Sequence, residues 1–276
     1  MEFSILIPSW NNLGYLKHCI RSIELNSTFS HQIIVIANEA KDGTLDWLKS
    51  NKYHYIHHQE NVGICVGLNS ASSLILKEYV VYLNDDMYVL PNWDKAFANE
   101  ISSISQNDYM LSGTMIEPRD TGNKCVLIAD FGDDLESFDE SAVLEYHKTA
   151  HKSDWSGATW PPILLPTHLW NKVGGMSEEF SPGMYSDPDL SMKVWQEGVR
   201  YFKGLGNARV YHFGSKSTTK LGKNVGRRIF LKKWNMTSGY FYKKHLKMGE
   251  KWAGPLQDYR LSLFDLIKNR VKKIIS

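Results

Sequence analysis

Residues 79–86 read Tyr-Val-Val-Tyr-Leu-Asn-Asp-Asp and determine the fold expected for this chain of 276 residues. The first five form an apolar run rich in strand formers, which indicates a buried strand. Asn84, Asp85 and Asp86 follow where that strand ends. Two adjacent carboxylates repel each other, and Mg²⁺ or Mn²⁺, which favours carboxylates together with phosphate oxygens, would relieve the repulsion. The alternative is an Asx turn, because Asn and Asp are ordinary turn residues.

The preceding sequence repeats this pattern of an apolar run followed by polar residues. Strands are predicted at residues 3–7, ended by Pro8, and at residues 32–37 and 53–58, with helices at 13–23, 42–48 and 62–77 between them. Such alternation predicts a parallel sheet with helices on both faces. Ligands of these sheets bind beyond the carboxyl ends of the strands, so the polar strand ends define a candidate site.

The second half of the chain is less regular. Long loops with a hairpin are expected over residues 117–155, where function often resides. The remaining patterns predict helices at 92–105, 167–173, 190–197, 229–246 and 261–274, and strands at 109–115, 199–203 and 209–212.

Charge is divided unevenly along the chain. Residues 216–276 hold 16 of the 32 Lys and Arg residues but only three of the 30 acids, while the rest of the chain is acidic. A basic tail on an acidic body suggests anionic partners. The three cysteines are scattered and make neither a disulfide framework nor a zinc cluster, which favours a reducing cytoplasm. No apolar run approaches the length of a membrane span, and no signal peptide is expected.

Asp187 has two interpretations. It stands before Pro188 at the start of a helical pattern, so it fits an N-cap with proline at the first helical position. Alternatively, it lies at the mouth of the cleft and accepts a proton from a hydroxyl group as a general base.

His212 follows a short strand and is either a packed histidine or a nitrogen ligand of a cation that a carboxylate already holds. The stretch 215–228 is polar and basic, with Lys220, Arg227 and Arg228 near its end. It is either a solvated loop or a cover over a pyrophosphate that is later released. Tryptophans such as Trp160 could stack on sugars, although most are expected in the core.

In combination, these segments resemble the inverting family 2 glycosyltransferases of the GT-A fold over roughly residues 1–235, of the type that builds bacterial surface polysaccharides. The resemblance rests on six segments in the family's order. They are Ser4-Ile5-Leu6-Ile7-Pro8-Ser9-Trp10-Asn11, Asp42-Gly43-Thr44, Asn61-Val62-Gly63 with Gly67 and Asn69, Leu83-Asn84-Asp85-Asp86 with Pro91, Val173-Gly174-Gly175-Met176-Ser177-Glu178-Glu179-Phe180, and Asp187-Pro188-Asp189-Leu190.

The resemblance implies an α/β GT-A domain at residues 1–215, with a nucleotide-sugar-binding half (1–116) and an acceptor-side half (117–215), followed by a basic helical extension at 216–276. It implies Asp187 as catalytic base, with Asp189 as the alternative, and a Mn²⁺ or Mg²⁺ ion held by Asp86 and His212. Trp160 and Asp189 would lie on the acceptor side. The donor would contact Pro8, Ser9, Trp10, Asn38, Glu39, Asn61, Gly63, Asn84, Asp85, Lys220, Arg227 and Arg228.

Two positions depart from the family pattern. Residues 37–40 read Ala-Asn-Glu-Ala, so the aspartate that reads the nucleobase is missing and Asn38 or Glu39 must replace it. Ser186 stands where the family has a glutamate, which leaves Asp187 as the carboxylate of that turn. The implied reaction moves a sugar, with inversion, from a nucleotide-diphospho-sugar to a hydroxyl of a glycan or lipid-linked glycan.

The C-terminal pattern places Phe264, Ile267, Val271 and Ile274 on one helical face. Basic residues surround this face, which suits a helix lying on the anionic inner leaflet of the cytoplasmic membrane. The alternative is a helix packed against the acidic body. A cytoplasmic protein, peripheral at that membrane through this helix, follows from the first interpretation, and a homo-oligomer is compatible with both.

Other classes remain as alternatives. A catalytically silent nucleotide-sugar-binding protein would share the sheet and the strand ends. A sugar-1-phosphate nucleotidylyltransferase would need a Gly-rich basic loop after the first strand, where Pro-Ser-Trp-Asn-Asn stands. Nucleic-acid binding would use the basic tail, but the acidic body argues against it.

Overall fold

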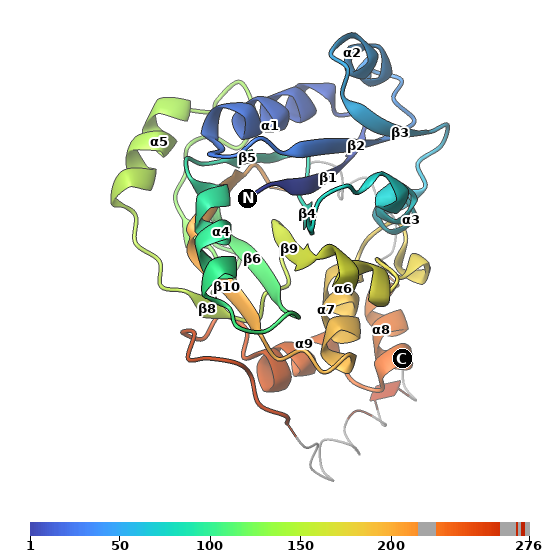
Figure 1. The fold of residues 1–276 in the computed structure, drawn as a ribbon, viewed down its shortest axis with the longest axis vertical. Coiled ribbons are helices and arrows are strands. Elements are labelled where there is room, and N and C mark those ends of the chain that lie inside the picture. The colour runs from blue at the N-terminus through green and yellow to red at the C-terminus, as the bar shows by residue number, and fades with distance from the viewer. Residues whose placement is uncertain (215–224, 260–268, 270–271, 274–276) are drawn as a thin grey trace.

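The amino-terminal part of the chain forms the alternating strands and helices that the apolar runs predict. The structure, a computed structural model, describes residues 1–214, 225–259, 269 and 272–273 (Figure 1). The first four strands pair in parallel in the order β3-β2-β1-β4. Their bounds are β1 Phe3–Trp10, β2 Gln32–Asn38, β3 His54–His58 and β4 Tyr79–Tyr82, and the intervening helices are α1 Leu13–Asn26, α2 Thr44–Ser50 and α3 Gly63–Ser70, extended by the 3₁₀ turn η1 Ala71–Leu74.

Strand β1 does not end at Pro8, as the sequence suggested, but continues to Trp10. The carbonyl of Leu6 accepts a bond from Leu83 on the β4 side, and backbone groups of residues two apart in a strand point to the same side. The missing N–H of Pro8 therefore faces a position where β4 has already ended. Proline costs no ladder bond there, and β1 continues alongside β2.

The sheet continues beyond β4 in the order β9-β6-β10-β5, with β9 and β5 antiparallel to their neighbours. The predicted strands at 199–203 and 209–212 are one long strand, β10, with a register shift between Leu205 and Arg209. The elements of this part are β5 Met87–Val89, α4 Trp93–Ser103, β6 Met110–Glu117, β7 Leu127–Ile128, α5 Glu140–Thr149, β8 Trp155–Ser156, β9 Ile163–Pro166, α6 Thr167–Lys172, η2 Glu178–Phe180, α7 Ser186–Gln196 and β10 Phe202–His212.

Alternate residues of the strands pack into two hydrophobic clusters, because side chains along a strand point to opposite faces. Ile5 and Ile7 pack with residues of α1 and α4, whereas Leu6 packs with residues of α3 and α7. The mainly parallel sheet with helices on both faces is the expected GT-A architecture (Figure 1).

The described part of the C-terminal segment joins this core, since Phe230, Phe241 and Leu246 are buried in the same cluster as α7. The single helix predicted at 229–246 is wrong. Asn235 takes a left-handed conformation and ends the first helix. The observed pieces are α8 Gly226–Trp234, α9 Ser238–Phe241 and a π-helical turn, η4 Tyr242–Leu246. The predicted helix at 261–274 lies almost wholly outside the described residues.

The predicted loops of 117–155 contain a helix, α5, that the sequence prediction missed. Asp139 caps it by accepting a hydrogen bond from the backbone of Ala142, and Glu140 in the first turn and Lys148 in the last complement the helix dipole. These charges and the cap were available in the sequence as a signal.

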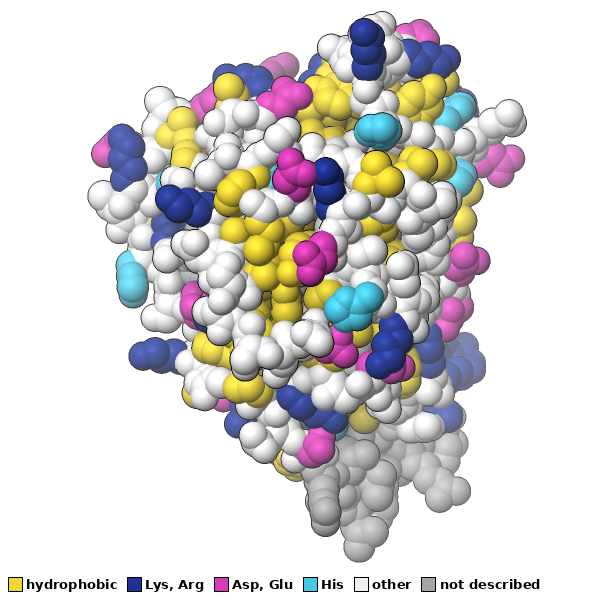
Figure 2. All heavy atoms as spheres, in the orientation of Figure 1, with side chains coloured by type: hydrophobic (Ala, Val, Ile, Leu, Met, Phe, Trp, Pro, Cys, Tyr) yellow, Lys and Arg dark blue, Asp and Glu magenta, His cyan; other side chains and the backbone are white. Residues whose placement is uncertain are grey.

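The surface drawn in Figure 2 carries acidic and basic side chains side by side, with a hydrophobic band near its middle. The acidic character of the body is thus a net balance and not a uniform field on this face. Within the described residues, every helix is too short or too polar to cross a lipid bilayer.

Candidate active site

A cavity of about 470 Å³ brings together residues from distant parts of the sequence, from Ile64 to Tyr242. Asn84 and His212 line it at the carboxyl ends of β4 and β10, and Asp187 at the start of α7 also lines it. The convergence of these strand ends with the turn at Asp187 is the arrangement that the sequence predicted.

Asp86 faces His212 because of the strand pairing. Strands β5 and β10 are antiparallel with Met87 opposite His212, so the residue before Met87 lies beside the imidazole. Nε2 of His212 is 3.6 Å from Oδ1 of Asp86. Both predicted metal ligands are therefore adjacent.

Glu117 completes this group, and the sequence prediction missed it. Strand β6 runs parallel to β10 with Ile116 opposite Tyr211, so Glu117 at the end of β6 lies next to His212. Its Oε1 is 3.0 Å from Nδ1 of His212. Burial alone would lower the pKa of His212, but Asp86 and Glu117 raise it to about 10. A carboxylate at the end of a predicted strand was the signal available.

Asp85 is almost fully buried beside the end of β1. Burial, followed by the charge of Asp86, raises the pKa of Asp85 to about 7, against the opposing influence of the Ser9 and Asn12 side chains. A cation near this pair would remove the repulsion between the two carboxylates.

A divalent ion fits Asp86 and His212. They would hold it through a carboxylate oxygen and an imidazole nitrogen, and the carboxylate of Glu117 would orient the imidazole from its other nitrogen. Among the described residues, no group of three or more His, Cys, Asp or Glu side chains is arranged to hold a metal. The ion would therefore need further oxygens from a diphosphate or water.

Asp187 is not the N-cap of α7, contrary to that interpretation. The cap position is Tyr185, in a left-handed conformation, and Asp187 is the second residue of the helix. Burial raises the pKa of Asp187 to about 7, with a smaller opposing effect of Ser186. Within the described residues, its Oδ1 has no hydrogen-bond partner. The carboxylate is thus available to a ligand in the cavity.

The contacts of Asp189, the alternative base, argue against a catalytic role. It is fully buried, accepts a 2.7 Å hydrogen bond from Nε1 of Trp234 and pairs with Lys233 at 3.0 Å. These contacts attach α8 to α7. Trp160 does line the cavity, with its ring 5.5 Å from that of Tyr242.

Asn38 and Glu39, the two candidates for contacting the nucleobase, differ in exposure and in hydrogen bonding at the end of β2. Asn38 is buried, and its Oδ1 accepts a 3.3 Å hydrogen bond from the backbone of Val62, so this side chain positions the start of α3. Glu39 remains partly exposed, and its Oε2 accepts a 2.8 Å bond from Asn11. Glu39 is therefore the more accessible of the two carbonyl-type acceptors.

The loop before α3 holds the turn that carries Asp187. Asn61 accepts a 3.0 Å bond from the backbone of Gly63, which has φ of 78°. A Cβ on Gly63 would lie 2.6 Å from Cα of Pro182, and Ile64 donates a 2.8 Å bond to the Pro182 carbonyl. The structure thus places Gly63 against the turn at Pro182, which precedes Asp187.

Asn69 makes a comparable connection. Its side-chain amide exchanges two 2.8 Å hydrogen bonds with the backbone of Met176, as a strand partner would. The segments around Gly63 and Gly175, which are far apart in the sequence, are therefore in direct contact.

The predicted basic residues are dispersed. Lys220 lies outside the described residues. Arg227 and Arg228 are exposed on α8 instead of in a loop, and Arg227 lines a second pocket beyond Tyr185.

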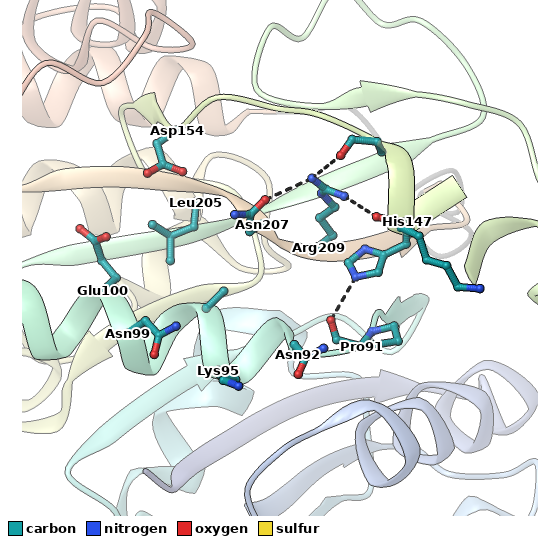
Figure 3. A pocket seen from close by; sticks show the side chains of 13 residues that line it. Pro91, Asn92, Lys95, Asn99, Glu100, His147, Asp154, Leu205, Asn207 and Arg209 are labelled. Carbon is teal, nitrogen blue, oxygen red and sulfur yellow. Dashed lines mark hydrogen bonds between the residues drawn. The ribbon is translucent and has the colours of Figure 1, made fainter. Parts of the chain in front are cut away.

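A further cavity, between α4 and the loop after α5, contains none of the predicted site residues (Figure 3). Its buried Arg209 donates to the carbonyls of Gly206, His147 and Ala150 at 2.7–2.9 Å. Two of these carbonyls lie at the C-terminal end of α5, where a cation is stabilised by the helix dipole. This arginine therefore has a structural role.

The fold and the site together define a class: a GT-A protein whose acidic strand edge opens into a cavity with a further carboxylate. Residues 4–122 match the family described as glycosyl transferase family 2. This part of the chain is therefore similar to the glycosyltransferases of family 2. No curated protein sequence matches the chain.

Solved structures share the fold. S. aureus TarS 1-349 is 16% identical with a TM-score of 0.57, over 84% of this chain and 64% of that one. Its complex with UDP-GlcNAc is 17% identical with a TM-score of 0.55, over 78% and 61%. GalNAc-T7 with UDP, GalNAc and Mn²⁺ is 15% identical with a TM-score of 0.55, over 77% and 44%. The chain thus spans less than two thirds of the TarS chains in the first two comparisons.

Proposed function

We propose that this protein transfers a sugar from a nucleotide-diphospho-sugar to an acceptor hydroxyl, with inversion at the anomeric carbon. The observation that carries the proposal is the single cavity that Asn84 and His212 share with Asp187. The strand ends would hold the donor, and Asp187 would face the acceptor. The UDP-GlcNAc and UDP bound in similar structures support a nucleotide-sugar donor.

On the donor side, the base would pack near Pro8 and Trp10 with Glu39 as its polar contact, and Ser9 and Asp85 would lie near the ribose. Asp86 and His212 would hold Mn²⁺ or Mg²⁺, which supplies positive charge to the departing diphosphate. The Mn²⁺ in the GalNAc-T7 structure supports this choice of ion. Glu117 keeps Nε2 of His212 directed at Asp86.

On the acceptor side, Asp187 removes the proton from the attacking hydroxyl. Its pKa of about 7 suits a general base near neutral pH. A carboxylate with this raised pKa is a stronger base than an ordinary aspartate, and part of it is still ionised at neutral pH. The hydroxyl oxygen attacks the anomeric carbon from the face opposite the diphosphate, which inverts that centre. The acceptor would be a glycan or lipid-linked glycan of a surface polysaccharide, and Trp160 provides an aromatic wall for it.

The experiment begins with thermal-shift screening against UDP, GDP and dTDP sugars, with and without Mn²⁺. A donor is expected to raise the melting temperature in proportion to the logarithm of its concentration. Slow hydrolysis of that donor is then followed by NMR, which reports the anomeric configuration of the first sugar released. A released sugar of inverted configuration supports the proposal, and a retained configuration contradicts it. Donor binding without hydrolysis or transfer would instead identify a catalytically silent binder.

A further inference from the structure

A second pocket, of about 440 Å³, adjoins the cavity that holds Asp187. Tyr185, Ser238 and Tyr242 line both, so the two spaces share a wall. Arg227 of α8 and Lys272 bring positive charge to the second pocket. The two pockets are therefore neighbours, and Tyr185 between them lies two residues before Asp187 in the chain.

This positive charge is not compensated within the described part of the chain. Neither Asp nor Glu is among the described residues that line the pocket, and Arg227 and Lys272 form no ion pair or hydrogen bond with any described residue. Lys233 on the same helix is different, because it pairs with both Glu179 and Asp189. The two cations in the pocket are thus available to an external anion.

Asn269 is a second and independent observation. It lines the pocket with only 4% of its surface exposed, and its Nδ2 has no hydrogen-bond acceptor among the described residues. A buried donor without an acceptor costs free energy that a ligand oxygen would recover. The lining of the pocket also includes the hydroxyls of Thr237 and Ser238.

We propose that this pocket binds a phosphate group of the acceptor and so places a neighbouring hydroxyl at Asp187. The inference rests on the proposed function and names the acceptor class: a sugar or polyol that carries phosphate. A guanidinium, an ammonium, an amide N–H and hydroxyls supply more donors than a carboxylate can use, whereas a phosphate accepts from all of them. In the proposed function, the diphosphate of the donor would instead lie at Asp86, beside His212 of the adjoining cavity.

The test measures binding of glycerol 1-phosphate by calorimetry, with enzyme saturated by Mn²⁺ and by the nucleoside diphosphate that screening identifies. That saturation fills the donor site, so the remaining phosphate site is the one measured. Arg227→Gln and Lys272→Gln should each weaken binding about tenfold or more, because a hydrogen bond to a charged group is lost. Lys232→Gln is the matched control, since Lys232 is exposed on α8 and lines neither pocket. Asn269→Asp, which keeps the shape but adds a negative charge, should also abolish binding.

Two acceptor arms distinguish the source of the phosphate. Transfer is measured to glycerol 1-phosphate and to a sugar linked by phosphate to a polyprenol in detergent micelles. Loss of transfer in Arg227→Gln with either acceptor supports the proposal, and the acceptor used identifies a soluble or a lipid-linked phosphate.

Absence of glycerol 1-phosphate binding by the wild type would overturn the inference, as would unchanged affinity in Arg227→Gln and Lys272→Gln. A weaker affinity for the nucleoside diphosphate in Arg227→Gln, with unchanged affinity for glycerol 1-phosphate, would assign this arginine to the donor instead. None of these outcomes depends on donor hydrolysis by the wild type, which tests the proposed function separately. Failure of the proposed function would appear separately, as no donor binding or hydrolysis at all.

Discussion

The proposed donor side and the proposed acceptor side of the cavity differ in how their charges are satisfied. On the donor side, His212 lies between Asp86 and Glu117, so its charge is opposed by two carboxylates. On the acceptor side, Oδ1 of Asp187 and the cation of Arg227 have no partner among the described residues. The donor edge is organised before any ligand arrives, whereas the acceptor side needs a ligand to complete it.

The largest effect is expected from the acceptor side. Asp187→Asn removes the proposed base and should lower the transfer rate about 10²–10⁴-fold, since a positioned base contributes that much. The dissociation constant of the donor should remain near that of the wild type. Both are measured by steady-state kinetics and calorimetry, with Asp46→Asn on the exposed face of α2 as control. A variant with wild-type turnover would exclude Asp187 as the base.

A smaller effect is expected from the residue that positions His212. Glu117→Gln keeps the size of the side chain but loses its charge, so Nδ1 of the imidazole is held less firmly. Changes to such supporting residues lower metal affinity about 10–100-fold. Titration with Mn²⁺ followed by electron paramagnetic resonance measures the affinity directly. Glu145→Gln, in a surface ion pair, should leave it unchanged; equal Mn²⁺ affinity in both variants would show that Glu117 has no such role.

The contact between Gly63 and Pro182, in the turn before Asp187, can be strained by a single added methyl group. Gly63→Ala introduces a Cβ at φ of 78° and 2.6 Å from Cα of Pro182, so the turn before Asp187 must move. We expect a loss of about 1–3 kcal/mol in the free energy of unfolding and a lower transfer rate. Gly174→Ala is the control, because its φ of 70° is similar but its added Cβ meets nothing within 4 Å. If chemical denaturation gives both variants the same loss, the contact with Pro182 is unimportant.

A second effect of Asp187 concerns the dependence of stability on pH. The pKa of Asp187 is raised to about 7 in the folded protein, above its unfolded value of about 4. Between these values the folded state binds more protons, so stability is fully retained below pH 4 and is lost progressively as the pH rises to 7. Asp187→Asn cannot ionise. Its melting temperature should exceed that of the wild type more at pH 8 than at pH 5; a difference that shrinks with pH would contradict this sign.

Much of the fold was predictable, because long apolar runs with a clear period carry their own signal. The strands β1 to β4 and the helices between them follow their predicted ranges within a few residues, apart from the shorter α3. Strand β5, with three residues, and β9, with four, gave no such signal. Their place in the sheet is set by neighbours, and β5 is the strand that brings Asp86 to His212.

The candidate site could be predicted only in part for a similar reason. Asp86, His212 and Asp187 were identified from strand ends and from a resemblance. The structure brings His212 and Asp187 to one cavity and places Asp86 beside His212. Glu117 was missed because its partnership with His212 depends on the register of β6 against β10. Asp189 was the alternative base by sequence, and its burial against Lys233 and Trp234 separates it from Asp187.

By itself, the sequence determined the order of the elements and the chemical type of each candidate group, because periodicity and side-chain chemistry are local properties. Tertiary structure decided which groups share a space: Glu117 with His212, Asp187 open to the cavity, and Arg227 beside Asn269 in an adjoining pocket. Such proximity depends on strand register and helix packing, which are set by contacts between residues far apart in the chain.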